Sequence, residues 1–460
     1  MNQSANFHTR HAKSGHHMDL INGSLLPKII AFALPLACAS ILQQFFNAAD
    51  TAIVGHFTEN GMAAVGVNSQ IVNILVGFAS GLSVGINVHI AGLIGRGEEK
   101  KIHDAIQSIL FLAILTGILT AAIGIVFSYP ILQLTKAPAE ILPEAAKYTR
   151  IYCLGLPFIM LYNFASAILR SRGDTRRPLY ALAVSGVVNI VLNIFFVVVL
   201  KLGVSGVAIA TTISGGISAA IVLRIVLKEE VSEDFYKSFN IHVGILVRIC
   251  KIGLPAAFQA MLFSISNMFV QAAINSFGAD AIAGNTAALN YEILSYYIAT
   301  ALAQTIVTFT SQNLGANKPE RARRSFRLCM LLSLAALLAI NTTVIYFGDF
   351  FLSFFTTSEA VIEQGLLRFH TVLIFHFLIC SYEITAGALR GYGYAMTPTI
   401  ISIIGTCLLR PAWIATYFHA HRSMKVLLSV YPISWVFTGT VMLGAYYMLI
   451  LSKKDSRLPA

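Results

Sequence analysis

The chain has 460 residues, of which 56% are hydrophobic and only 12% are charged. A soluble globular domain has about 25% charged residues, so this composition excludes a soluble protein and indicates one that lies in a lipid bilayer. The formal charge of +11 would suit a nucleic-acid partner, but the placement of the basic residues, described below, excludes that interpretation.

Ahead of the first apolar segment, residues 1–17 are polar and rich in histidine. We predict a disordered tail, although His11, His16 and His17 could instead bind a metal ion. No cleavable signal peptide is recognisable, and Met18 is an alternative start of translation.

Apolar segments follow that are long enough to cross a bilayer as helices, which takes about 20 residues. They lack the alternation of polar and apolar positions found in membrane β-barrels. The twelve expected spans are 28–57, 62–94, 103–128, 138–171, 177–200, 204–228, 242–276, 281–313, 323–347, 359–390, 397–418 and 425–452.

The two halves of the chain repeat the same landmarks 220 residues apart. The pairs are Leu34-Pro35 and Leu254-Pro255, Gly95 and Gly315, Leu169-Arg170 and Leu389-Arg390, Gly173 and Gly393, and Pro178 and Pro398. Because each half holds six spans, both halves enter the membrane from the same side. We therefore predict an all-α polytopic membrane protein of two six-helix bundles, related by a pseudo-two-fold axis along the membrane normal.

The repeat also predicts the organisation of the chain. We expect an N-terminal tail at 1–20, a first bundle at 21–228, a polar linker at 229–241, a second bundle at 242–452 and a C-terminal tail at 453–460. In the second span, Gly81 and Gly85 have the spacing that lets helix backbones approach closely, so we predict tight helix packing there.

Basic residues gather on one side of the predicted bundles. With twelve spans, 24 of the 32 Lys and Arg residues lie on the same side as the tails, in the tails, in the loops or at the span ends next to them. The positive-inside rule then places both termini in the cytoplasm, and we expect the cytoplasmic (inner) membrane of a bacterium. The basic excess therefore reflects topology, and no nucleic-acid partner is expected.

Three acidic residues lie deep in the predicted spans: Asp50, Glu292 and Glu383. A carboxylate at the bilayer centre costs about 2.5–3.5 kcal/mol on insertion scales, so such residues are candidates for function. The deep charges are thus expected to be acids, with Arg410, near the outer end of the eleventh span, as the main exception.

Asp50 shares one face of its helix with the polar residues Gln43 and Asn47. A polar stripe on an apolar helix lines a hydrated space, and burial favours the protonated form of a carboxyl group. Asp50 can therefore bind and release a coupling ion. The alternative is a packing role, in which it stays hydrogen-bonded to Asn189 or Asn193.

In the second half, Glu292 lies near Tyr296 in the eighth span. An acid beside aromatic rings suits an organic cation. Alternatively, the Glu292 carboxylate is a ligand of Na⁺ or makes a structural hydrogen bond. For Glu383 a structural role and a Na⁺-related role are equally open. Pro35 and Pro255 interrupt matching helices and predict hinges there.

These residues carry a family resemblance. The motifs are Leu34-Pro35 ahead of Asp50-Thr51 and Gly55, the turn from Arg170 to Pro178, the segment from Asn189 to Asn193, and the segment from Ser311 to Ala316. Together they make residues 20–452 resemble the multidrug and toxic compound extrusion (MATE) family.

The resemblance implies a monomeric antiporter that expels small, mostly cationic, amphipathic organic compounds in exchange for H⁺ or Na⁺. It also implies a proton-responsive carboxylate at the position of Asp50, with Asn189 and Asn193 beside it in the ion-coupling site. One departure stands out: a subgroup of the family often has Asp where this chain has Asn193, which cannot titrate.

Two other functions are alternatives to antiport. A flippase for a lipid-linked oligosaccharide, or another lipid, belongs to the same superfamily but needs several basic residues in its cavity. A channel or an enzyme is not favoured, because no filter loop, catalytic constellation or metal-binding motif is recognisable. No cofactor other than the coupling ion is expected.

Overall fold

The structure is a computed structural model that describes residues 17–57, 61–134, 140–230 and 240–452. All the regular elements in these ranges are helices. Within the described residues, 11 helical spans are long and apolar enough to cross a membrane, and a bent pair brings the number to 12. The predicted all-α fold with twelve spans is confirmed.

The first lobe contains the helices up to residue 230. They are α2 (Leu25–Phe57), α3 (Gly61–Arg96), α4 (Glu99–Leu134), α5 (Leu142–Leu154), α6 (Leu156–Ser171), α7 (Arg176–Asn193) with its π-helical continuation η1 (Ile194–Val199), and α8 (Val204–Glu230). The fourth predicted span is not one helix, because it bends by 44° between α5 and α6. Gly155 lies at the break, and Pro157, which has no N–H to donate, follows in the first turn of α6.

The second lobe contains the remaining helices. They are α9 (Val243–Asn275), α10 (Ala279–Gly315), α11 (Pro319–Tyr346), α12 (Gly348–Ser353), α13 (Glu359–Thr371), η3 (Leu373–Leu378), α14 (Ile379–Gly391), α15 (Met396–Ser402), η4 (Ile403–Leu408), α16 (Leu409–Trp413), η5 (Ile414–Phe418), α17 (Met424–Leu428), α18 (Val430–Tyr446) and η6 (Tyr447–Leu451). The lobe boundaries proposed from the sequence stay predictions, since 231–239 in the linker and the tails at 1–16 and 453–460 lie outside the described residues.

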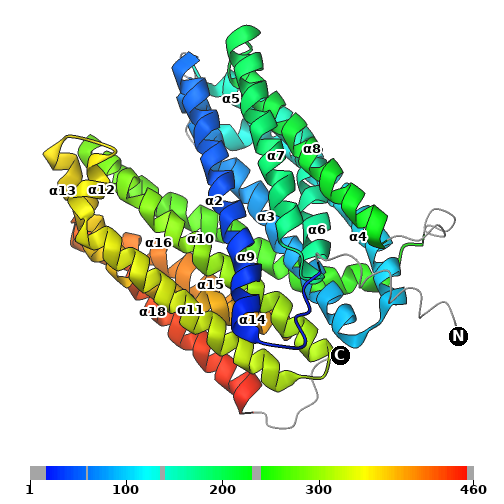
Figure 1. The fold of residues 1–460 in the computed structure, drawn as a ribbon. Helices are drawn as coiled ribbons and strands as arrows, with labels where there is room; N and C mark the ends of the chain where they lie inside the picture. The colour runs from blue at the N-terminus through cyan, green and yellow to red at the C-terminus, as the bar shows by residue number, and fades with distance from the viewer. Residues whose placement is uncertain (1–16, 58–60, 135–139, 231–239, 453–460) are drawn as a thin grey trace, which may run out of the picture.

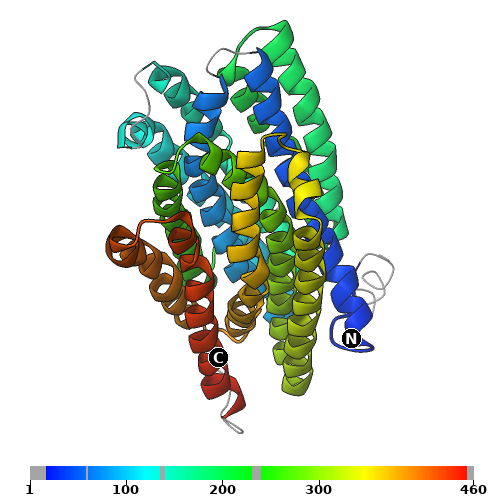
Figure 2. The same ribbon diagram turned by 90° about the vertical axis from the view of Figure 1, so that its left-hand side faces the viewer.

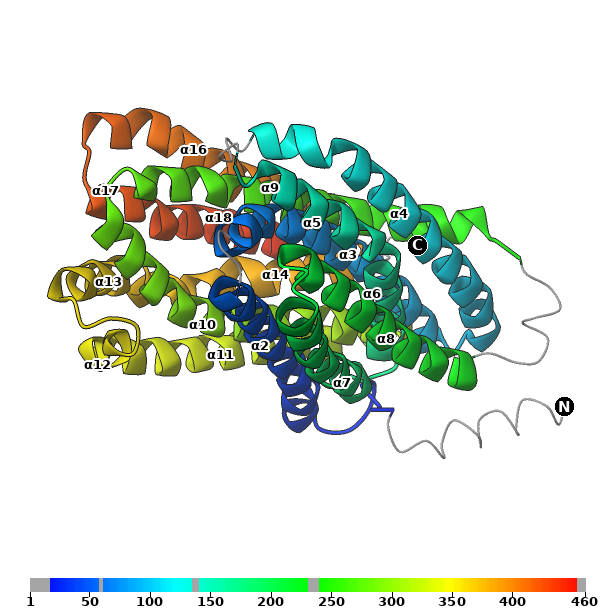
Figure 3. The ribbon, with the colours of Figure 1, turned by 90° about the horizontal axis from the view of Figure 1, so that it is seen from above.

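Both described ends of the chain lie on one side of the molecule, which we call the terminal side (Figure 2). The two lobes lie close together on this side and lean apart toward the opposite, distal side (Figure 1). Seen from above, α2 lies at the border between the lobes (Figure 3).

The lobes are joined by a seam of small residues between α3 and the helices α9 and α10. A Cβ added to Gly81 would lie 2.3 Å from Cα of Ala257, and one added to Gly85 would lie 2.3 Å from the carbonyl oxygen of Ile249. Only glycine permits backbones this close, so the tight packing predicted for Gly81 and Gly85 is confirmed. In the same seam, Asn87 on α3 and Thr308 on α10 are hydrogen-bonded at 3.0 Å.

α2 packs against both lobes. Its first half, from Leu25 to Ala37, belongs to the core of the second lobe, where Phe32 meets Phe309 edge to face at 5.7 Å. Its second half packs on α7, and Val54 belongs to a core of the first lobe. Pro35 lies inside this helix, near the point where the partner lobe changes.

Residues 17–24, which we call the strap, cross the terminal side ahead of α2. On the second lobe, Arg321 donates hydrogen bonds to the carbonyl oxygens of Asn22 and Gly23 at 2.7 and 2.8 Å, and Asn313 donates to that of Leu20 at 3.3 Å. Leu20 is 1% exposed. On the first lobe, His17 lies 3.4 Å from Glu229. The strap therefore contacts both lobes.

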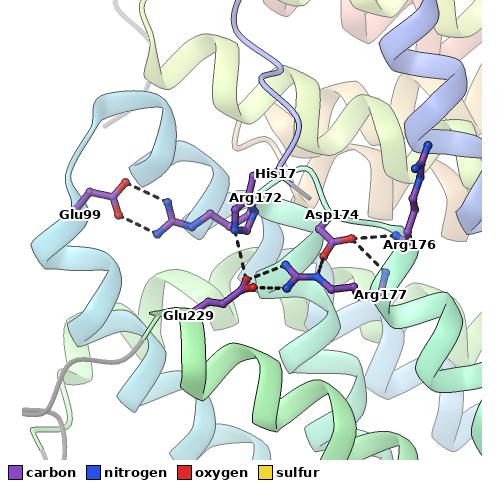
Figure 4. Close-up of polar contacts among 7 residues, drawn as sticks. All are labelled: His17, Glu99, Arg172, Asp174, Arg176, Arg177 and Glu229. Carbon is purple, nitrogen blue, oxygen red and sulfur yellow. Dashed lines mark hydrogen bonds and ion pairs between the residues drawn. The ribbon is translucent and has the colours of Figure 1, made fainter. Parts of the chain in front are cut away.

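A charged network holds the terminal side of the first lobe (Figure 4). Arg172 donates to both carboxylate oxygens of Glu99, at 3.0 and 2.8 Å, and Arg177 binds Glu229. Asp174 is 2% exposed; it accepts hydrogen bonds from the backbone N–H groups of Arg176 and Arg177 and from the Arg177 side chain. These contacts fix the turn between α6 and α7.

Candidate functional site

The cluster around Asp50 lies where α2, α7 and α8 meet in the first lobe. Asn193 Nδ2 donates to Asp50 Oδ1 at 2.5 Å, and Thr211 Oγ1 approaches Asp50 Oδ2 at 3.4 Å. Asn193 also donates to Asn189 Oδ1 at 3.2 Å. The structure thus brings together the three residues that the sequence grouped as an ion-coupling site, and adds Thr211 from α8.

This cluster is rich in oxygen and poor in counter-charge. Asn193 is 0% and Asn189 5% exposed, whereas Asp50 is partly exposed. Asn193 Oδ1 is buried and has no hydrogen-bond partner among the described residues. No ion pair involves Asp50 in the part of the chain that is described. A carboxylate with amide and hydroxyl oxygens around it can take up a proton or a hard cation.

The polar stripe on α2 continues from this cluster toward Pro35. Gln43 and Asn47 are exposed, and their neighbour Gln44 accepts a hydrogen bond from the Tyr297 hydroxyl on α10 at 3.1 Å. The stripe therefore reaches from Asp50 to a residue of the opposite lobe. Tyr297 was not among the predicted site residues, since no sequence pattern links α2 to α10.

Glu292 lies in the second lobe and is paired with a base. Arg368 Nη2 lies 2.7 Å and Nε 3.0 Å from Glu292 Oε2, and Arg368 Nη1 donates to Asn285 at 2.6 Å. Arg368 is 1% and Glu292 7% exposed. Glu292 thus faces Arg368 and does not present an unpaired carboxylate.

Arg368 was overlooked in the sequence, although an arginine inside an apolar span is itself a signal of function. Its burial makes the expectation that the deep charges are mainly acids wrong. The error arose because tertiary pairing with Glu292, 76 residues away, removes most of the cost of burying a guanidinium.

Glu383 and Tyr296 lie in the same lobe and are both partly exposed. The side chain of Tyr296 and the charge of Arg390 both act on the Glu383 carboxylate. Arg390 itself donates to Gln259 at 2.8 Å, and no direct ion pair joins it to Glu383 within the described ranges. This agrees with the two helical turns that separate Glu383 from Arg390 in sequence.

Arg410 is, with Arg368, one of the two buried arginines in the described part of this lobe, and it too is 1% exposed. It donates from Nη1 to Asn267 Oδ1 at 2.7 Å, and its guanidinium carbon lies 4.6 Å from the ring centroid of Tyr431. The same ring lies 5.1 Å from the guanidinium carbon of Arg368. Arg410 is therefore surrounded by neutral and aromatic groups.

A separate cavity of 810 Å³ opens on the terminal side, between α3, α4 and α9. Its charged lining is largely paired, since Glu98 lies 3.5 Å from Arg96 and 3.1 Å from Lys101. None of the residues of the Asp50 cluster lines this cavity. It is not the candidate site.

Both halves of the chain match the same protein family. The sequence profile of the MatE family matches residues 35–195 and again 255–414. The chain belongs to the MatE family. The two matches begin at Pro35 and Pro255, so the MatE unit coincides with the internal repeat. As a MatE protein the chain is a membrane transporter and not an enzyme.

Individual MatE relatives are distant but cover most of the chain. The probable multidrug resistance protein NorM of Thermotoga maritima is 27% identical, over 82% of this chain and 82% of its own length. The FAD transporter of Shewanella oneidensis is 25% identical, over 88% of this chain and 89% of its own length.

Solved structures of MatE transporters share the fold. A crystal structure of a MATE protein in complex with MaL6 has a TM-score of 0.87 at 21% identity, covering 95% of this chain and 99% of that one. A transporter of the MOP superfamily from Pyrococcus furiosus, described as having a binding pocket of reverse polarity, has a TM-score of 0.86 at 23% identity, covering 95% and 98%.

Proposed function

We propose that this MatE protein is a secondary antiporter that exports amphipathic organic compounds in exchange for H⁺ or Na⁺. The observation that carries the proposal is the Asp50 cluster, where a carboxylate with no basic partner among the described residues is surrounded by Asn189, Asn193 and Thr211. Export of several compounds is supported by the probable multidrug resistance protein NorM, which is similar over most of the chain.

The coupling step depends on the binding of an ion at the Asp50 carboxylate. An ion bound at Asp50 neutralises the cluster, and the orphan oxygen of Asn193 is available to a proton donor or a cation. Asn193 does not titrate, so Asp50 is the ionisable group through which coupling would act. The polar stripe through Gln43 and Asn47 supplies the contact surface for a substrate.

Alternating access requires the lobes to separate on the terminal side and approach on the distal side. The lobes converge on the terminal side, and α2 passes from one lobe to the other near Pro35. We propose Pro35 and its repeat partner Pro255 as hinges, because each breaks the hydrogen-bond ladder of its helix. By the positive-inside rule the terminal side faces the cytoplasm, and we propose a monomer in the cytoplasmic membrane.

The buried ionic groups of the second lobe do not favour a cationic substrate alone. Cationic compounds were expected from the family resemblance and from Glu292, but Arg368 pairs with Glu292. The buried arginines Arg368 and Arg410 favour a second candidate, a flippase for an anionic lipid. That function predicts movement of lipid without an ion gradient.

The test is transport by the purified protein in sealed vesicles. Efflux of a fluorescent organic cation is followed under a proton gradient and, separately, under a Na⁺ gradient. Efflux driven by one of the gradients supports antiport. If neither gradient drives efflux and a labelled anionic lipid changes leaflet instead, the flippase function replaces it.

A further inference from the structure

The interior of the second lobe holds more positive than negative charge. Apart from Lys318, Arg321 and Arg323 on the terminal side, its buried or partly buried ionic groups among the described residues are the guanidinium groups of Arg368, Arg390 and Arg410 and the carboxylates of Glu292 and Glu383. Arg368 is paired with Glu292, and Arg390 and Glu383 act on each other. No carboxylate lies within ion-pair distance of Arg410 in the described part of the chain.

The hydrogen bonds of Arg410 are also incomplete. Nη1 binds Asn267 Oδ1 at 2.7 Å and Nε lies 3.4 Å from Ser434 Oγ, whereas Nη2 has no hydrogen-bond partner among the described residues. The rings of Tyr431 and Phe263 lie 4.6 and 5.3 Å from the guanidinium carbon. Cation–π contacts stabilise a charge only in part, so a bound anion would stabilise the Arg410 guanidinium further.

The backbone around Arg410 is irregular. α16 is five residues long, and it is preceded by the π-helical η4 and followed by the π-helical η5. Such wide turns are uncommon, occur often at functional sites, and change the direction in which side chains point. Phe263, Asn267 and Tyr431 are partly exposed, so Arg410 lies one side chain behind the surface of its lobe.

We infer that Arg410 is an anion-binding residue of this transporter, and that it accepts the carboxylate or phosphate of an amphipathic substrate. The planar guanidinium offers paired N–H groups that match two oxygens of such a group, and the rings of Phe263 and Tyr431 suit its apolar body. The inference rests on the proposed transport function and specifies its substrate class. A soluble organic anion and the headgroup of an anionic lipid share this chemistry.

The binding test uses two probes of equal shape and opposite charge, 2-naphthoate and 2-naphthylmethylammonium. The full chain in phosphatidylcholine nanodiscs contains two tryptophans, Trp413 and Trp435; Trp413 lies on α16 and Trp435 is 5.9 Å from the Tyr431 ring, so intrinsic fluorescence reports on this lobe. We expect 2-naphthoate to bind about tenfold more tightly than the cation. Arg410→Gln should abolish the preference, Arg410→Lys should keep part of it, and the exposed control Arg224→Gln should leave it unchanged.

Binding needs no ion gradient, so this result is independent of whether antiport occurs. Adding phosphatidylglycerol to the nanodiscs separates the two sources: competition in the wild type but not in Arg410→Gln indicates a lipid headgroup, and no competition indicates a soluble anion. Exchange of labelled for unlabelled 2-naphthoate across vesicles, lost in Arg410→Gln, then identifies a substrate. Equal affinity for the two probes, or an unchanged preference in Arg410→Gln, would overturn the inference.

A stability measurement separates anion binding from a purely structural role. Arg410→Met removes an unpaired buried charge and keeps the apolar stem, so the melting temperature should rise while the anion preference is lost. If Arg410 serves only to hold Asn267 and Tyr431 in place, the same substitution should lower the melting temperature. That outcome, together with retained naphthoate binding, would contradict the site.

Discussion

Gly95 and Gly315, which occupy equivalent positions in the two repeats, meet each other at the seam between the lobes. A Cβ on Gly95 would lie 2.9 Å from Cα of Gly315, and one on Gly315 would lie 3.0 Å from Cα of Gly95. The repeat has thus placed the same small residue on both sides of one contact. This contact belongs to the terminal side, where the lobes must part in the proposed alternating-access cycle.

Replacing Gly95 with Ala should force the lobes apart on the terminal side. The new methyl group would lie 2.2 Å from the carbonyl oxygen of Gln312, a backbone atom that cannot move alone. We expect a shift toward states open on the terminal side, measured as longer distances between spin labels across the seam, with slower transport. Gly92→Ala is the matched control, because its nearest new contact is the end of the Arg96 side chain at 3.6 Å. Equal distances in both variants would refute the role of the seam.

Removing one partner of the Glu292–Arg368 ion pair should destabilise the fold more than removing both. Removing one partner of a buried ion pair costs about 3–5 kcal/mol, so Glu292→Gln should lower the melting temperature clearly. The double variant Glu292→Leu with Arg368→Met, which leaves no buried charge unpaired, should recover much of the loss. A double variant no more stable than Glu292→Gln would show that the pair is not the cause.

The strap should loosen when Asp19 loses its charge. Burial alone would raise the pKa of Asp19, but hydrogen bonds from Asn22 and from the backbone N–H groups of Ile21 and Asn22, with the charge of Lys28, hold the pKa below 3.8. The carboxylate therefore stabilises the strap at pH values above 3.8, and this contribution is lost as the pH falls through the lowered value.

Asp19→Asn should reproduce the acid state at neutral pH. We expect faster amide hydrogen exchange at residues 20–23 in this variant, and no change there for Asp104→Asn, whose carboxylate is exposed and lines the cavity between α3, α4 and α9. Exchange as slow as in the wild type would show that Asp19 does not hold the strap.

Pro35→Ala should impair transport without preventing insertion. Alanine can donate the backbone hydrogen bond that proline lacks, which straightens and stiffens α2 near the point where it changes lobes. Transport rates in vesicles and the elution profile of the purified protein measure the two effects. Pro130→Ala, at a proline inside α4, is the control. Full activity of Pro35→Ala would refute the hinge.

Much of this fold could be predicted from the sequence, because the bilayer imposes a minimum length on every span and the repeat imposes a symmetry. The contact of Asp50 with Asn193 was also within reach, since both are polar residues in apolar spans of one half. Contacts between helices that share no sequence pattern could not be predicted. Arg368 with Glu292 and Gln44 with Tyr297 arise from tertiary packing, which no local period records.

The bend between α5 and α6 shows the same limit on a smaller scale. Gly155 and Pro157 are visible in the sequence, but glycine and proline also occur within continuous membrane helices, as Pro35 does in α2. Only the packing of α5 and α6 against their neighbours decides which of these positions breaks a span. The strap could not be predicted for a related reason, because a segment of eight residues is too short to show a periodicity.

We propose that Asp50 is the group through which an ion gradient drives transport. Asp50→Asn keeps a side chain of the same shape beside Asn193 and Thr211 but cannot ionise. The direct measurement compares substrate exchange at equilibrium with uphill efflux under the driving gradient, in the same vesicles. We predict that Asp50→Asn exchanges substrate but no longer responds to the gradient; uphill efflux at the wild-type rate in this variant would contradict the claim.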